Sequence, residues 1–132
     1  MNTKPCLTQE DCRKIQAACE AEARKNNWKV TVAILDDGGH LLSLSRMDGA
    51  SPVTAEIATE KGRSAAVSRR STKVSEDRIA GGRLVLLKMP VLPVQGGVPI
   101  MHQGECVGAV GVSGVQSHED EQVAIAGIAA LG

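Results

Sequence analysis

The sequence predicts an α+β fold in which one central antiparallel sheet of about five strands is flanked by helices. Two observations carry this prediction. Two pairs of segments alternate apolar and polar residues on either side of a short turn, which is the pattern of β-hairpins. Other segments repeat apolar residues at helical spacing. Because strands joined by hairpins run antiparallel, this order argues against a parallel dinucleotide-binding sheet.

The first part of the chain predicts one helix and one hairpin. Thr8 and Asp11 have the spacing of a capping box at the start of a helix over 8–26. The strands of the hairpin are expected at 28–35 and 41–47, joined by an Asp-Asp-Gly-Gly turn. The apolar stripe of the helix consists of Cys12, Ile15, Cys19 and Ala23.

The middle of the chain predicts helices. A helix over 53–69 is followed by a short helix that is capped by Ser71 or Thr72 and ends at a Gly-Gly pair at 81–82. The apolar run at 84–87 is too short for periodicity to assign it to a helix or a strand.

The last part predicts a second hairpin and a final helix. Its strands are expected at 98–102 and 106–113, after a stretch broken by prolines. Ser117 and Asp120 have the spacing of a second capping box, which would open the final helix.

The composition is that of a soluble globular protein, and we expect one domain over residues 1–132. Hydrophobic residues make up 42% of the chain and charged residues 23%. Trp28 is the sole aromatic residue, so the stacking platforms that bind single-stranded nucleic acid are missing. The chain also has no apolar run of membrane length and no signal-peptide pattern. We therefore expect a cytoplasmic protein with no nucleic-acid or membrane partner.

The cysteines do not form a metal-binding pattern. The four cysteines include no Cys-x-x-Cys pair, and no histidine is spaced to complete a zinc site with them. We interpret them as small buried hydrophobic residues of a protein from a reducing compartment.

The charges are unevenly distributed along the chain. The segment 61–88 contains eight basic and two acidic residues, so its net charge is +6, and the rest of the chain balances it at −6. Such a segment suits a small anionic ligand or an acidic patch on a neighbouring subunit. A solvated helix face explains it equally well.

The strand at 106–113 is expected to have one face with almost no side chains. Gly108, Val110 and Val112 point to one side, and Val107 with Ala109, Gly111 and Ser113 point to the other. A glycine inside a strand marks a place where another backbone or a ligand comes close. We therefore expect something to lie on the second face.

A ligand-binding pocket is one interpretation of this face. Backbone N–H groups in Gly-rich turns can hold a carboxylate or a phosphate. The alternative is that the small residues admit a helix, while Arg46–Asp48 and Glu60–Lys61 are ion pairs that hold the fold. The candidate ligand-binding residues are Arg46, Asp48, Lys61, Ser64, Gly96, Gly97, Pro99, Gly111, Ser113 and Gly114.

Five segments taken together resemble a known family. They are 36–41 (DDGGHL), 46–50 (RMDGA), 58–66 (ATEKGRSAA), 96–100 (GGVPI) and 108–114, followed by the Asp-Glu pair at 120–121. In order and spacing they are similar to the GlcG/HbpS-like family, which includes the C-terminal domain of PduO-type proteins. The similarity extends over nearly the whole chain.

The resemblance implies a profilin-like fold and a homo-oligomer built from dimers, such as a tetramer or an octamer. It also implies genes that lie beside those for glycolate, glycerol or propanediol use. Some family members bind haem or iron, so haem is a candidate cofactor. The haem-binding members use a histidine near their first helix, whereas this chain has no histidine before His40.

The remaining candidates for a haem ligand are three histidines and two methionines. His40 lies in a predicted turn, His102 ends a strand, and His118 begins the final helix. None of them has a second histidine at ligand spacing. Met47 and Met101 are weaker candidates for an axial ligand.

Three classes of function remain open. The first is an oligomeric accessory protein that binds a small anionic ligand, with haem as one candidate. The second is a small cofactor-independent enzyme that acts on a C2–C3 hydroxy acid or aldehyde through Arg46, Asp48 and Lys61. The third is a structural accessory protein with no ligand. We predict no catalytic residue, because nucleophile-elbow, P-loop, HExxH and triad motifs are all missing.

Overall fold

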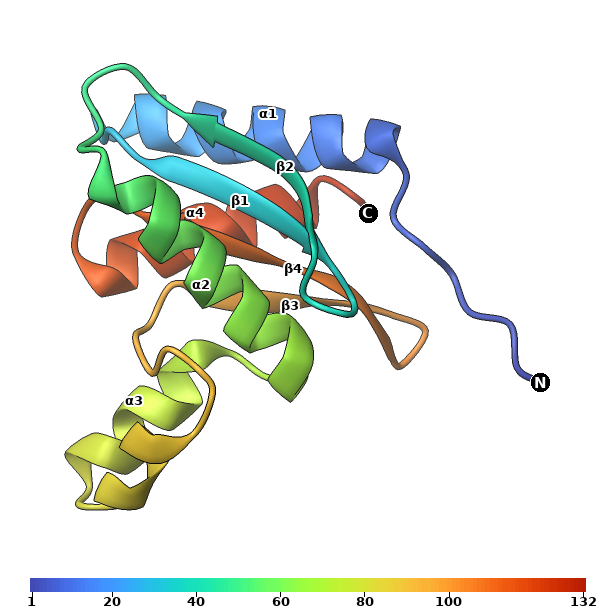
Figure 1. The fold of residues 1–132 in the computed structure, drawn as a ribbon. Coiled ribbons are helices and arrows are strands. Elements are labelled where there is room, and N and C mark those ends of the chain that lie inside the picture. Colours follow the sequence, from blue (N-terminus) through green and yellow to red (C-terminus); the bar gives the residue numbers. More distant parts are fainter.

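Four antiparallel strands form one sheet, and helices cover both of its faces (Figure 1). The computed structural model describes residues 1–132. The strand order is β2-β1-β4-β3, so the two hairpins meet through β1 and β4 at the centre. The predicted α+β class is confirmed, with four strands in place of about five. The elements are α1 (Gln9–Lys25), β1 (Thr31–Asp36), β2 (Leu41–Arg46), α2 (Val53–Ser68), α3 (Thr72–Ala80), the 3-10 helix η1 (Leu84–Lys88), β3 (Gly97–His102), β4 (Glu105–Ser113) and α4 (Ser117–Ala129).

One face of the sheet packs against α1 and α4 and forms the main core. The capping box at Thr8 and Asp11 starts α1, as the sequence predicts. Its predicted apolar stripe is buried against branched residues of β1 and β4. The chain has almost no aromatic side chains, so aliphatic side chains fill this layer. The strand residues in it include Val32, Ile34, Val110 and Val112.

The expected fifth strand does not form. The apolar run at 84–87 belongs to η1, none of whose residues is buried. The prolines at 90 and 93 follow it directly, and a proline has no N–H to donate to a sheet ladder. With α3, this segment makes an arm that projects from the sheet (Figure 1).

The other face of the sheet lies against α2, and the contact is made mainly by small residues together with the buried Leu35. Ala33, Ala58, Ala65 and Ala109 are fully buried in this layer. A Cβ atom added to Gly111 would lie 1.9 Å from the carbonyl oxygen of Ala58. Such a separation is far inside van der Waals contact, so only glycine fits there. The object on the small-residue face is thus the backbone of α2.

Two local predictions are corrected by the structure. Val107 packs in the main core with Val110, because a register shift between β3 and β4 makes Val107 an extra residue of β4. The capping box of α4 is formed by Gln116 and Glu119, one residue earlier than expected. This shift frees Asp120 for another partner.

No helix of this structure has both the length and the apolar character needed to cross a bilayer.

The contact of α2 with β4 predicts a large loss of stability for Gly111→Ala. The new methyl group meets backbone atoms, which cannot rotate away, so we expect a loss of about 3 kcal/mol in the free energy of unfolding. Urea unfolding followed by circular dichroism measures it. The matched control is Gly81→Ala, because Gly81 has φ −80° and its Cβ would meet nothing closer than 3.4 Å. Equal unfolding midpoints for the two variants would contradict the packing argument.

Candidate functional site

The predicted site residue Lys61 lies in a buried polar cluster between α2, β4 and α4. Its Nζ donates to Asp120 Oδ2 and to the carbonyl oxygen of Val112, both at 3.0 Å. The side chains of Lys61 and Asp120 are 3% and 2% exposed. Asp120 Oδ1 accepts from the amide of Val115 at 3.1 Å. Burial raises the pKa of the Asp120 carboxyl, and the Lys61 charge and the Val115 amide counter part of that rise.

Several other predicted residues surround this cluster and bond to the protein itself. Gly97 donates its amide to Thr72 Oγ1 at 3.0 Å, and Ser64 Oγ accepts from the amide of Leu92 at 2.7 Å. A Cβ atom on Gly96 would lie 2.7 Å from Lys61 Nζ. These residues therefore come together at the interface of α2 with the sheet. Ligand binding at this interface stays a prediction.

The remaining predicted residues lie along the strands or at their ends. Ser113 is buried where β4 ends, Gly114 follows it in an exposed turn, and Pro99 is half-buried on β3. Arg46 and Asp48 are exposed and form no ion pair. The structure therefore does not bring Arg46 and Asp48 together with Lys61.

The fold-holding ion pairs considered from the sequence also differ from those observed. Glu60 pairs with Arg63 at 3.1 Å, and Lys61 pairs with Asp120. The sequence offered Asp120 only as a helix-capping residue. The ion pair of Asp120 with Lys61 depends on the position of α2, and the local spacing of residues does not reveal that position.

A second candidate site lies near the chain ends, in a groove of about 540 Å³. The N-terminal segment, the end of β3 and the end of α4 form its walls. Eight of its twelve lining residues are hydrophobic, including Ile100, Val107, Ile128 and Leu131. Cys6, Met101 and His102 also line it. The groove therefore combines apolar walls with a thiol, a thioether and an imidazole.

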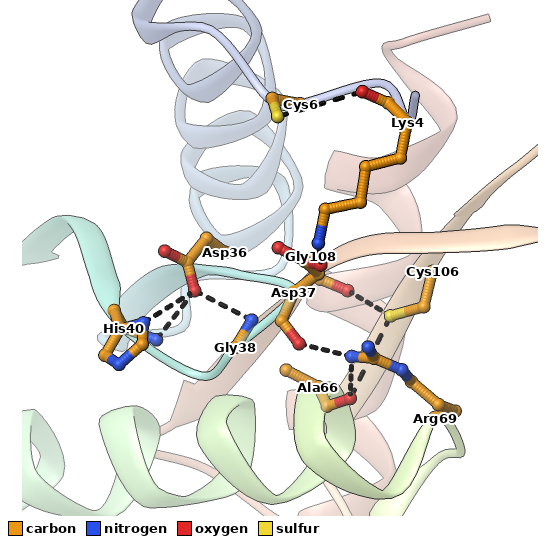
Figure 2. Close-up of polar contacts among 10 residues, drawn as sticks. All are labelled: Lys4, Cys6, Asp36, Asp37, Gly38, His40, Ala66, Arg69, Cys106 and Gly108. Carbon is orange, nitrogen blue, oxygen red and sulfur yellow. Dashed lines mark hydrogen bonds and ion pairs between the residues drawn. The ribbon is translucent and has the colours of Figure 1, made fainter. Parts of the chain in front are cut away.

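The three histidines have different surroundings. His40 lies in the β1–β2 turn, where Asp36 Oδ1 accepts from the amides of Gly38 and His40 and lies 3.3 Å from His40 Nδ1 (Figure 2). His118 is exposed in the first turn of α4. His102, although exposed, borders the apolar groove. It is therefore the histidine best placed to meet an apolar ligand.

The N-terminal segment is attached to the sheet next to this groove. Lys4 forms an ion pair with Asp37, and the Arg69 guanidinium donates to the carbonyl oxygen of Asp37 (Figure 2). The pair with Lys4 lowers the pKa of the Asp37 carboxyl. Lys4 and His102 together line a smaller groove of about 430 Å³. A cation thus lies in the same surface region as the imidazole.

The four cysteines are all free, and their environments differ. Burial raises the pKa of the Cys12 thiol, and it raises the pKa of Cys19 to about 12. These two match the prediction of small buried residues, whereas Cys6 is exposed and Cys106 half-buried. No three His, Cys, Asp or Glu side chains are grouped so that they could hold a metal ion.

Comparison with known proteins identifies the family. The family model described as "Haem degrading protein HbpS-like" matches residues 7–129. The chain belongs to the HbpS-like family. Protein GlcG of Escherichia coli strain K12 is 49% identical to this HbpS-like chain over 114 residues, which are 86% of this chain and 85% of GlcG.

Solved structures agree with this assignment. The HbpS-like chain matches the crystal structure of a double mutant of Streptomyces reticuli HbpS with a TM-score of 0.90 and 32% identity, over 100% of this chain and 91% of that chain. It matches the structure titled as a PduOC:Heme Complex with a TM-score of 0.86 and 26% identity, over 96% of this chain and 95% of that chain. The resemblance seen in the sequence is thereby confirmed.

Sequence reasoning includes His102 among three candidate haem ligands, but it does not predict the groove around it. The groove is lined by residues from the segments 5–11, 100–107 and 128–132, which are far apart in the chain. The only local signal was the run of apolar residues at the end of the final helix, and that run is equally typical of an ordinary core.

The buried ion pair predicts strong coupling between Lys61 and Asp120. Lys61→Met leaves a buried carboxylate without its counter-charge, and we expect a loss of about 3–5 kcal/mol in the free energy of unfolding. Asp120→Leu should cost a similar amount for the converse reason. The double variant should lose much less than the sum of the two, because it buries no unpaired charge. Urea unfolding of the four proteins measures this, and additive losses would contradict a direct pair.

Thiol environments predict an order of modification. At pH 8, Ellman's reagent should react with Cys6 within the mixing phase and with Cys19 only as the protein unfolds, because burial suppresses the Cys19 thiolate. The time course of absorbance in the wild-type protein, compared with that in the Cys6→Ser variant, measures the order in which the thiols react. A fast phase that persists in Cys6→Ser would contradict this assignment.

Proposed function

We propose that this protein binds haem in the groove near the chain ends, where His102 would hold the iron. The observation that carries the proposal is the position of His102 at the border of an apolar groove that Met101 and Cys6 also line. Imidazole, thioether and thiolate are the side-chain groups that most often coordinate haem iron. Haem carries two propionates, so it also fits the expectation of a small anionic ligand.

The groove suits a haem in size and in polarity. Its volume of about 540 Å³ lies within the range of small-ligand sites. Its aliphatic walls suit the faces of a porphyrin. Lys4, which lines the smaller groove together with His102, is the cation placed to meet a propionate, and it would then share its charge with Asp37. The acidic residue that lines the groove, Asp11, is engaged in the capping box of α1.

The comparisons support the proposal. The family model is described as haem-degrading, and one related structure is titled as a haem complex. Free cysteines, one of them exposed, favour a reducing compartment such as the cytoplasm.

When bound, haem supplies the iron-centred redox and ligand chemistry, and the protein supplies its environment. The imidazole of His102 would hold the iron. The side chains of Ile128 and Leu131 would exclude water from one side of the groove. The N-terminal segment, held by Lys4 and Asp37, would cover the other side.

Nothing in the structure favours a cofactor-independent enzyme. That alternative needs Arg46, Asp48 and Lys61 in one site, and Lys61 is instead buried with Asp120 while the other two are exposed.

The proposal predicts one saturable haem site per subunit. Titration of the apo protein with hemin should give a shifted Soret band that saturates at one equivalent. His102→Ala should weaken binding about tenfold or more and change the band position, because the imidazole that would hold the iron is lost. The matched controls are His40→Ala and His118→Ala, which alter exposed histidines outside the groove.

Two results would contradict the proposal. One is a band that serum albumin reproduces and that does not saturate, which would remove haem as the ligand. The other is a specific band that moves in a control variant but not in His102→Ala, which would keep haem and reject this groove.

A further inference from the structure

The N-terminal segment before α1, residues 2–7, has few attachments to the rest of the protein, and we call it the strap. It belongs to no helix or strand, and its backbone forms no hydrogen bond with another backbone group. The ion pair of Lys4 with Asp37 is its one polar contact with another segment (Figure 2). The side chain of Lys4 is 58% exposed, and an exposed ion pair contributes little free energy.

One apolar side chain anchors the strap. Leu7 is half-buried and packs against the main core, whereas residues 2–6 are exposed. A Cβ atom on Gly108 would lie 2.6 Å from Leu7 Cδ1, so the missing side chain of Gly108 leaves space that Leu7 occupies. The strap is thus held by one exposed ion pair and one leucine.

The strap borders four grooves of the protein, which have volumes of about 430–540 Å³. Leu7 is the one residue that lines both the groove beside His102 and a groove of about 440 Å³ between the start of α1 and β2. If Leu7 moves away, these two grooves join.

The floor of the groove beside His102 is covered while the strap is in place. Ile100 and Val107 line this groove, yet they are 2% and 6% exposed. A ligand that packs on them must therefore displace a wall. The last turn of α4 forms the opposite wall, where the amide of Leu131 donates to the carbonyl oxygen of Ile128 at 3.1 Å and both side chains pack on the core. The strap is the wall with the weaker attachments.

We propose that the strap is a lid on this groove, with the ion pair of Lys4 and Asp37 as its latch and the start of α1 as its hinge. The capping box of Thr8 and Asp11 fixes the chain at the hinge, so the strap moves as a short arm. The ligand enters while the lid is open, and the strap then closes over it. The identity of the ligand as haem rests on the proposed function, whereas the opening of the lid does not.

Cys12 reports on the lid in the absence of any ligand. It is 4% exposed and lines the 440 Å³ groove together with Leu7, so its thiol becomes accessible when Leu7 leaves. Cys19 is fully buried in the main core and reports on unfolding of the whole molecule instead. Iodoacetamide is a small uncharged reagent for both thiols. Peptide mass spectrometry then gives the alkylation rate of each cysteine separately.

Asp37→Asn should raise the alkylation rate of Cys12 about two- to fivefold and leave that of Cys19 unchanged, because the variant releases the latch alone. The matched control is Asp77→Asn, which removes another exposed ion pair, that of Asp77 with Lys73 on α3. The control should change neither rate. An unchanged Cys12 rate in Asp37→Asn, or equal increases at Cys12 and Cys19, would overturn the lid.

Stopped-flow measurement of hemin association tests whether the lid admits the ligand. If entry requires the open state, Asp37→Asn should accelerate hemin association by the same factor as Cys12 alkylation. Lys4→Gln breaks the same latch with the opposite change in charge, so an increase in both variants does not come from attraction of the anionic hemin. Faster Cys12 alkylation with an unchanged rate of hemin association would overturn the role of the lid in entry. A protein that binds no hemin would contradict the proposed function, and the alkylation rates would still decide the lid.

Discussion

The close approach of α2 to the centre of the sheet is the constraint on which the other features depend. At Gly111 there is room for a hydrogen atom and nothing larger, because the Ala58 carbonyl occupies the space of a side chain. This approach brings the stem of Lys61 down to the end of β4, where the ammonium meets Val112 and Asp120. A lysine is buried here because its charge is paired and two of its three N–H donors have acceptors.

The ion pair also connects two helices that lie on opposite faces of the sheet. Figure 1 shows α2 on one face of the sheet and α4 on the other. Lys61 and Asp120 join these helices at the end of β4, so the start of α4 is fixed relative to α2. Because a helix is rigid, fixing the first turn of α4 also fixes the position of its last turn. Ile128 and Leu131, which line the groove beside His102, are thereby positioned by a contact at the far end of the same helix.

Local features of this fold could be predicted from the sequence, and features that depend on tertiary contacts could not. The capping box of α1 and the turn between β1 and β2 use residues close together in the chain, so their spacing is sufficient. Val107 leaves its predicted face because of a bulge, and a bulge depends on the register with β3. Asp120 has two roles open to it, and only the position of Lys61 selects between them.

The same distinction applies to the candidate site. A strand face without side chains can receive a ligand or a helix, and the pattern of glycines is identical in the two cases. Distance decides, because a ligand would need atoms at van der Waals separation whereas the α2 backbone already lies 1.9 Å from the position of a Cβ on Gly111. The space that remains is in the groove beside His102, where the side chains are large and the walls come from three distant segments. A groove of this kind leaves no pattern in a sequence. The glycine pattern of β4, the most regular motif of the chain, therefore indicates helix packing, and His102, which no motif distinguishes, lies at the better candidate for a ligand site.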